Sequence, residues 1–227
     1  MNETVIAVGN GGYNLATDLI AAGLFQDSRL IVCDTNEKDL EKNSANAMET
    51  YLLEKLNGKG NSVNAPIVEN IVAKASDSVI ICVTLGGMTG SKYAPLIALE
   101  AILKGKFVCS LFAMPYEFEG EQKTKRAMNA RMQLIASSNF AVQQNNDRLK
   151  AVESLGLNDI DKPLVETLKS AMKDRTLVEL ANDPKNDALQ EYIPEEYRVK
   201  DLPLVWLCND TYRGITDEDR KGVFNLY

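Results

Sequence analysis

Two glycine-rich turns in the sequence have the composition of phosphate-binding loops. The first, VGNGGYN, spans residues 8–14, and the second, LGGMTGS, spans residues 85–91. Each follows an apolar run and precedes a segment whose apolar residues recur at helical spacing. Bare backbone N–H groups and a helix N-terminus together attract anions, so each turn could hold a phosphate. The alternative is that the glycines only permit a tight turn.

The first turn also resembles a dinucleotide fingerprint. Gly9 and Gly11 are followed by Asp34 at the end of the next apolar run, where an acid would meet the adenine ribose. The third glycine of that fingerprint is replaced by Asn14. A dinucleotide enzyme does not need the second glycine turn, whereas a nucleoside di- or triphosphate held between two loops would use both. NAD or ATP binding by a Rossmann-type enzyme remains the alternative.

The elements that must position these turns follow a regular alternation. Strands are expected at residues 4–8, 30–33, 78–83, 106–112 and 140–144. Helices are expected at residues 14–23, 36–56, 67–75, 93–105, with Pro95 in its first turn, and 119–136. This order predicts an α/β fold, a Rossmann-like parallel sheet with helices on both faces. Beyond residue 150 we expect one helix over 163–181 and a strand over 202–208.

Composition excludes several classes of function. The net charge of −7 and the pI of about 4.8 disfavour a nucleic-acid or membrane-surface partner. The chain opens without a basic-plus-apolar leader, and no apolar run approaches the roughly 18 residues that span a bilayer, so a cytoplasmic protein is expected. The sequence has no histidine and its four cysteines lie far apart, so neither His-dependent catalysis nor a protein-held metal is expected.

Five segments, in order across residues 4–150, resemble the FtsZ/tubulin GTPases, and FtsZ most closely. The two glycine turns resemble the family's phosphate loops, with Met88 and Lys92 standing where the signature GGGTG[ST]G has glycines. The other three are IVCDTNEKDL (31–40), like the loop after the second strand; AMPYEFEGEQK (113–123), like the ribose loop; and QQNNDRL (143–149), like the guanine-reading Asn-Asp segment.

The resemblance implies binding of GTP or GDP, with Mg²⁺ accompanying the nucleotide. The implied contacts are Gly11, Gly12 and Asn14 at the α/β-phosphates, Gly86, Gly87, Met88, Thr89, Gly90 and Ser91 at the β/γ-phosphates, Glu119 at a ribose hydroxyl, and Asn146 at the guanine. Lys123 is a further implied site residue, because it stands where the family commonly has arginine. Structural alternatives stay open for five of these residues, and Gly11 and Gly12 could only make a turn. Glu119 and Lys123 could form only an exposed i,i+4 ion pair, and Asn146 could be a helix N-cap.

The resemblance weakens where hydrolysis would be expected. The family's Asn-x-Asp-x-x-Asp loop has no good copy, because NDPKND (182–187) offers Asp183 and Asp187 at a different spacing. The second acid that the family uses on guanine has only Asp174 as a candidate. No catalytic residue is assigned.

We expect a nucleotide-binding domain over 1–181 and a charged extension over 182–227, without a second FtsZ domain. The leading hypothesis is an FtsZ-like GTP-binding protein with weak or partner-dependent GTP hydrolysis. Its partners would be itself or an FtsZ-type filament, in filament assembly or its regulation. The non-enzymatic alternative is a nucleotide-gated interaction protein.

Overall fold

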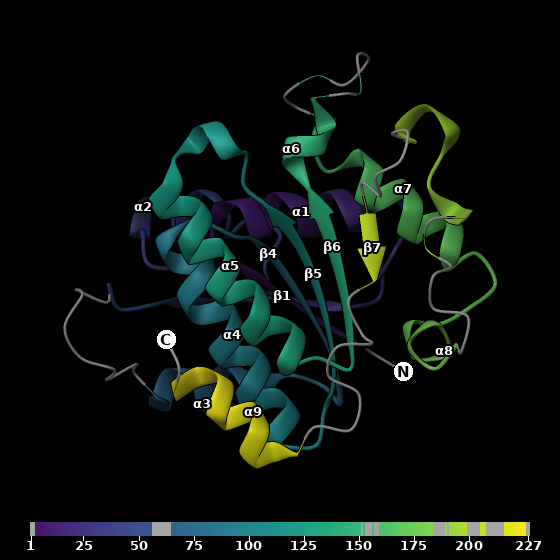
Figure 1. Cartoon of the computed structure of the whole chain (residues 1–227). Coiled ribbons are helices and arrows are strands. Elements are labelled where there is room, and N and C mark those ends of the chain that lie inside the picture. The colour runs from purple at the N-terminus through teal and green to yellow at the C-terminus, as the bar shows by residue number, and fades with distance from the viewer. Residues whose placement is uncertain are drawn as a thin grey trace.

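A seven-stranded sheet forms the centre of the molecule (Figure 1). The computed structural model describes residues 3–55, 65–150, 152, 156, 159–183, 189, 191–198, 205–207 and 216–225. In spatial order the strands are β3 (Glu49–Leu52), β2 (Arg29–Asp34), β1 (Thr4–Val8), β4 (Ser78–Thr84), β5 (Phe107–Met114), β6 (Phe140–Asn145) and β7 (Val205–Leu207). The pairs from β3 to β6 are parallel, and β7 is antiparallel to β6. The predicted Rossmann-like parallel sheet is therefore confirmed.

Helices cover both faces of the sheet (Figure 1). They are α1 (Gly9–Ala21), α2 (Glu37–Lys42), α3 (Ala65–Lys74), α4 (Met88–Leu103), α5 (Glu121–Ala136), α6 (Asn146–Leu149), α7 (Lys162–Ala171), α8 (Leu177–Ala181) and α9 (Asp217–Asn225). Alternate residues of β1 point to opposite faces. Val5 shares a core with Leu15 of α1 and Leu164 of α7. Ile6 shares the other core with α3, α4 and α5.

The prediction of one helix over residues 36–56 is wrong, because the structure has a short helix and a strand there. Helix α2 ends at Lys42, and Glu49–Leu52 forms the edge strand β3. This strand pairs in parallel with β2, with Ile31 opposite Glu49 and Asp34 opposite Leu52. Hydrogen bonding to a strand distant in sequence therefore outweighs the local helical spacing of the apolar residues, a contest that propensity alone cannot settle.

The helix expected over residues 163–181 is divided in two. Helix α7 ends at Ala171, and α8 begins after Thr176. The Thr176 hydroxyl accepts the Glu179 N–H, and the Glu179 carboxylate accepts the Thr176 N–H. This capping box starts a new helix and separates it from α7. The predicted strand over 202–208 is described at residues 205–207, where β7 lies.

Helices α1 and α4 each begin five residues earlier than expected, because residues of the glycine turns belong to the helices. Helix α1 begins at Gly9 and α4 at Met88. Pro95 is consequently inside α4 rather than in its first turn. Proline has no N–H and so cannot donate to the preceding turn of the helix. Its buried position packs it against neighbouring elements.

Candidate functional site

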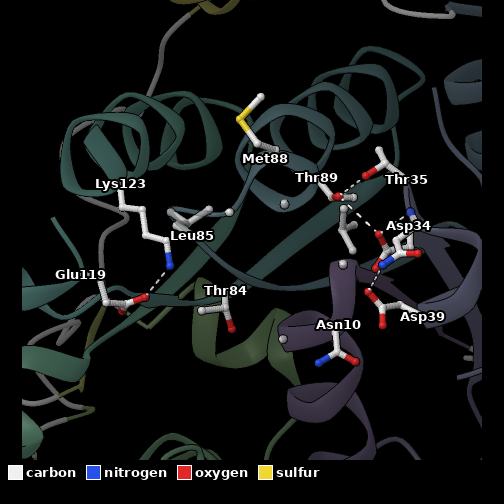
Figure 2. Close-up of a pocket in the computed structure, with 16 residues that line it drawn as sticks. Asn10, Asp34, Thr35, Asp39, Thr84, Leu85, Met88, Thr89, Glu119 and Lys123 are labelled. Atoms are coloured by element: carbon white, nitrogen blue, oxygen red, sulfur yellow. Dashed lines mark hydrogen bonds and ion pairs between the residues drawn. The ribbon is translucent and has the colours of Figure 1, made fainter. Parts of the chain in front are cut away.

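The carboxyl ends of β1, β2 and β4 open onto a cavity of about 550 Å³. Such an edge, where a parallel sheet changes its direction of winding, is the usual ligand site of these folds. The predicted residues that line the cavity are Gly11, Gly87, Met88, Thr89, Gly90, Glu119 and Lys123 (Figure 2). The two glycine turns and the 113–123 segment, far apart in sequence, therefore meet at one place.

Three glycines bring α1 and α4 against β4. A Cβ at Gly12 would lie 2.3 Å from the Cys82 carbonyl oxygen, and one at Gly11 would lie 2.5 Å from the Thr84 hydroxyl. A Cβ at Gly90 would lie 2.6 Å from the Val83 side chain. No real Cβ tolerates such distances, so close packing requires these glycines. The same packing brings the N-terminal turns of both helices to the cavity.

Gly87 differs from those three glycines. A Cβ there would have no neighbour within 4 Å, and the φ of −70° is open to any residue. Gly87 is exposed at the cavity wall as the N-cap of α4. Packing does not explain this glycine, whereas close approach of a ligand would.

Gly86 and Ser91 support the turn from behind. Gly86 has a φ of +97°, which favours glycine, and its N–H donates to the Ser91 hydroxyl at 2.8 Å. Both residues are buried and neither lines the cavity. In this structure the Ser91 hydroxyl fixes the turn, a role that differs from the predicted phosphate contact.

The loop after β2 is joined to the first turn of α4. The Thr35 and Thr89 hydroxyls lie 2.6 Å apart, and Thr89 also donates to the Asp34 carboxylate at 3.3 Å. The Asn36 N–H donates to the same carboxylate oxygen at 3.0 Å. Sequence reasoning gave Thr35 and Asn36 no nucleotide role, and gave Asp34 one only under the NAD alternative. The IVCDTNEKDL match was the signal that could have found them.

Glu119 and Lys123 form the ion pair that was the structural alternative for them, and the pair lies at the cavity. Lys123 Nζ is 2.8 Å from Glu119 Oε2, and Glu119 Oε1 accepts the Tyr116 N–H at 2.9 Å. Partial desolvation raises the pKa of Glu119, but these two hydrogen bonds and the positive charge of Lys123 together outweigh it and leave the pKa below its usual value. The carboxylate is therefore charged at neutral pH and can accept a hydrogen bond from a ligand.

Asn146 is not the N-cap of its helix. The N-cap of α6 is Asn145, whose side chain accepts the Asp147 N–H at 3.1 Å. Asn146 is the first residue of α6, only 3% exposed, and its Oδ1 accepts from Gln144 Nε2 at 2.9 Å. The same Gln144 nitrogen donates to the Ile160 carbonyl at 2.8 Å. Asn146 is thus tied to the segment that precedes α7.

A buried carboxyl group in that segment escaped sequence reasoning. Asp161 is 7% exposed and directly precedes α7, whereas Asp174 is exposed beyond the other end of this helix. Burial and the nearby Asp18 of α1 raise the pKa of Asp161 to about 6. Asp18 lies one helical turn after the exposed Asn14, so Asn14 and Asp18 share a face of α1. No sequence spacing links Asp18 to Asp161.

Of the two acids considered for hydrolysis, the structure describes one. Asp183 is ion-paired with Arg175 at 2.6 Å, and Asp187 lies outside the described residues. In the described ranges, no three His, Cys, Asp or Glu side chains gather as a metal site would require. Nor is any described helix both long and apolar enough to cross a lipid bilayer.

Comparison with known proteins assigns the family. The model of the tubulin/FtsZ family GTPase domain matches residues 3–154. The chain belongs to the tubulin/FtsZ family. The match extends over both glycine turns, the 113–123 loop and α6 of this FtsZ-like chain.

Individual relatives agree with the family assignment. The cell division protein FtsZ of Mycoplasmopsis pulmonis is 34% identical over 158 residues, covering 65% of this chain and 40% of that protein. FtsZ 1 of Pyrococcus woesei is 28% identical over 199 residues, covering 81% of this chain and 54% of that protein. The FtsZ-like chain thus spans 40% to 54% of the length of these relatives.

Solved structures share the fold. An empty FtsZ dimer of M. jannaschii superposes with a TM-score of 0.60 at 21% identity, covering 75% of this chain and 54% of that one. A GTPγS-bound protofilament of Haloferax volcanii CetZ2 gives a TM-score of 0.59 at 21% identity, covering 74% and 57%. At these identities the likeness concerns the fold of the FtsZ-like chain alone.

Proposed function

We propose that this chain is a guanine-nucleotide-binding domain that takes GTP or GDP in the cavity between its two glycine turns. The observation that carries the proposal is the open Gly87 beside the N-terminal turns of α1 and α4, in a chain of the tubulin/FtsZ family. GTPγS in the CetZ2 protofilament and GDP in a CetZ1 monomer of Haloferax volcanii support a guanine nucleotide.

Phosphates would lie between the two helix N-termini. Backbone N–H groups of Gly11 and of Gly87 to Gly90 would donate to phosphate oxygens. The charged side chains lining the cavity are Asp34, Asp39, Glu119 and Lys123, and the lysine is already paired with Glu119. These side chains alone would repel a triphosphate, so Mg²⁺ arriving with the nucleotide is needed to offset the phosphate charge.

The base would lie toward Asn146 and Asp161. Guanine presents two neighbouring N–H donors, N1–H and N2–H, and an ionised carboxylate can accept both. Adenine presents an acceptor at N1, so Asp161 would discriminate against ATP. The buried amide of Asn146, held by Gln144, would contact the same edge of the base, and Glu119 would accept a ribose hydroxyl.

The residues give less support to hydrolysis than to binding. Asp183, the described acid of the NDPKND segment, is ion-paired with Arg175. We therefore propose slow or partner-dependent hydrolysis, with self-association or an FtsZ-type filament as the partner. The family's filament-forming members, such as the CetZ2 protofilament, favour this partner over others. A purely nucleotide-gated binding module is the second candidate, favoured by the same Arg175–Asp183 ion pair.

Identification of the copurifying nucleotide tests the proposal most directly. Protein purified without added ligand should release GDP or GTP on denaturation, detected by ion-pair chromatography. In a thermal-shift assay, ligand at a hundred times its dissociation constant adds about 2.7 kcal/mol of stability. For a chain of this size that is a shift of roughly 5–10 °C. GTP and GDP should produce it and ATP and NAD should not; an equal shift with NAD would favour the dinucleotide alternative.

A further inference from the structure

Arg126 of α5 holds the second glycine turn from outside the cavity. Its Nε donates to the Gly86 carbonyl at 2.8 Å, and its Nη1 lies 2.9 Å from the Met88 sulfur. Gly86 and Met88 flank Gly87, the open residue at the cavity wall. The Arg126 guanidinium therefore contacts the turn on both sides of Gly87, the residue that a phosphate would approach.

The contact with the Gly86 carbonyl sets the direction of the next N–H. A peptide unit is planar and trans, so the Gly86 carbonyl and the Gly87 N–H point in opposite directions. Arg126 draws the carbonyl toward α5 and thereby directs the Gly87 N–H away from it. Both residues that flank this peptide are glycines, so its rotation is less restricted by side chains than that of other peptides, and the Arg126 contact can decide its orientation.

The contact with Arg126 holds the Met88 side chain outside the space that a phosphate would occupy. Met88 lines the cavity and is 48% exposed, at a position where the resembling signature has glycine. Figure 2 shows its side chain directed away from Thr84 and Asn10 on the other side of the cavity. The guanidinium holds the sulfur in that outward position.

We propose that Arg126 is a positioning residue for the β- and γ-phosphates, acting through the Gly86 carbonyl and the Met88 side chain. This inference rests on the proposed guanine-nucleotide function. The consequence concerns only ligands that reach the second glycine turn. The affinity for GTP and GDP should depend on Arg126. The affinity for GMP should not, because its single phosphate reaches only the first turn.

The test compares Arg126→Ala with wild type and with Lys125→Ala. Lys125 is the adjacent, exposed cation of α5, so its removal matches the change in charge without touching the turn. Dissociation constants for GTP and GDP come from calorimetry with Mg²⁺ present, and that for GMP from competition against a fluorescent GDP. A lost charge-assisted hydrogen bond predicts about tenfold weaker GTP and GDP binding, with GMP changed by less than about twofold. Lys125→Ala should bind all three as wild type does.

Arg126→Lys distinguishes the effect of the two contacts with the turn from the effect of the positive charge, because lysine keeps the charge. Lysine cannot contact the carbonyl and the sulfur at once, so this variant should also bind GTP several-fold more weakly. It also replaces Arg126→Ala if circular dichroism shows that the alanine variant does not fold. Wild-type GTP affinity in Arg126→Ala or Arg126→Lys, or equal losses for GTP and GMP, would overturn the positioning role. Absence of guanine-nucleotide binding by the wild type would overturn the proposed function itself.

Discussion

Gly12 packs against Cys82 so closely that an added Cβ would lie 2.3 Å from the Cys82 carbonyl oxygen. This contact seats α1 on β4, whereas Gly87, in the other turn, has open space around it. Two glycines of one candidate site are thus present for different physical reasons. Substitution at each should separate folding from ligand binding.

We predict that Gly12→Ala destabilises the fold. The added methyl group must displace strand backbone, and overpacking of this kind costs about 1–3 kcal/mol. For a chain of this size the melting temperature should fall by roughly 2–10 °C. Calorimetry without nucleotide measures the loss, and an unchanged melting temperature would mean that α1 can move away from β4 at little cost.

We predict that Gly87→Val leaves the fold almost intact and weakens nucleotide binding. The native φ of −70° suits valine, and no atom lies within 4 Å of the new Cβ, so the cost is that of a poorer N-cap, about 1 kcal/mol or less. The branched side chain would keep a phosphate from the turn, lowering GTP affinity at least tenfold by a loss on the order of 1.4 kcal/mol. Calorimetric titration checks this, and the melting temperature of the empty variant shows whether the fold is retained. Unchanged affinity would place the phosphate elsewhere.

We predict that Asp161 opposes folding at neutral pH. Burial and Asp18 raise the pKa of Asp161 to about 6, from an ordinary value near 3.8. Between these values the folded state binds more protons than the unfolded state, so this group's contribution to stability falls as pH rises from about 4 to 6. Asp161→Asn should therefore stabilise the empty protein at pH 7, by at most about 3 kcal/mol, and give little gain near pH 4. Urea titrations at several pH values measure the difference, and a gain independent of pH would contradict this cause.

We also predict that Asp161→Asn weakens GTP binding and narrows the preference over ATP, although it stabilises the empty protein. The amide can accept one of guanine's two N–H donors but brings an N–H of its own to face the other. In the wild type, GTP affinity should rise between pH 5 and pH 7 as Asp161 ionises. Asp174→Asn, at an exposed position beyond the C-terminal end of α7, is the matched control. Equal effects of the two substitutions would remove Asp161 from the base site.

Local patterns in the sequence predicted the central strands and the two turns, because buried parallel strands are continuous apolar runs and their turns need glycine. They could not predict β3, because its pairing with β2 places Ile31 opposite Glu49, and local patterns carry no information on pairing between separate segments. Asp161 was missed for the same reason, since only the packing of α1 near the start of α7 brings Asp18 close to it. Sequence likewise could not separate Gly12, required by packing, from Gly87, which packing leaves open.

We predict that this chain alone binds GTP but hydrolyses it slowly, well below about 1 s⁻¹. Phosphoryl transfer to water needs an acid or amide that aligns the attacking water, and Mg²⁺ offsets phosphate charge without providing that alignment. Asp183, the described acid of the NDPKND segment, is held by Arg175 at 2.6 Å. Phosphate release should be measured across protein concentration, alone and with an FtsZ filament protein; stimulation by the filament would support completion of the site in trans. Fast hydrolysis that increases with concentration of this chain alone would refute slow turnover and indicate self-assembly, with Asp183→Ala and Asp187→Ala as the first variants to locate the acid.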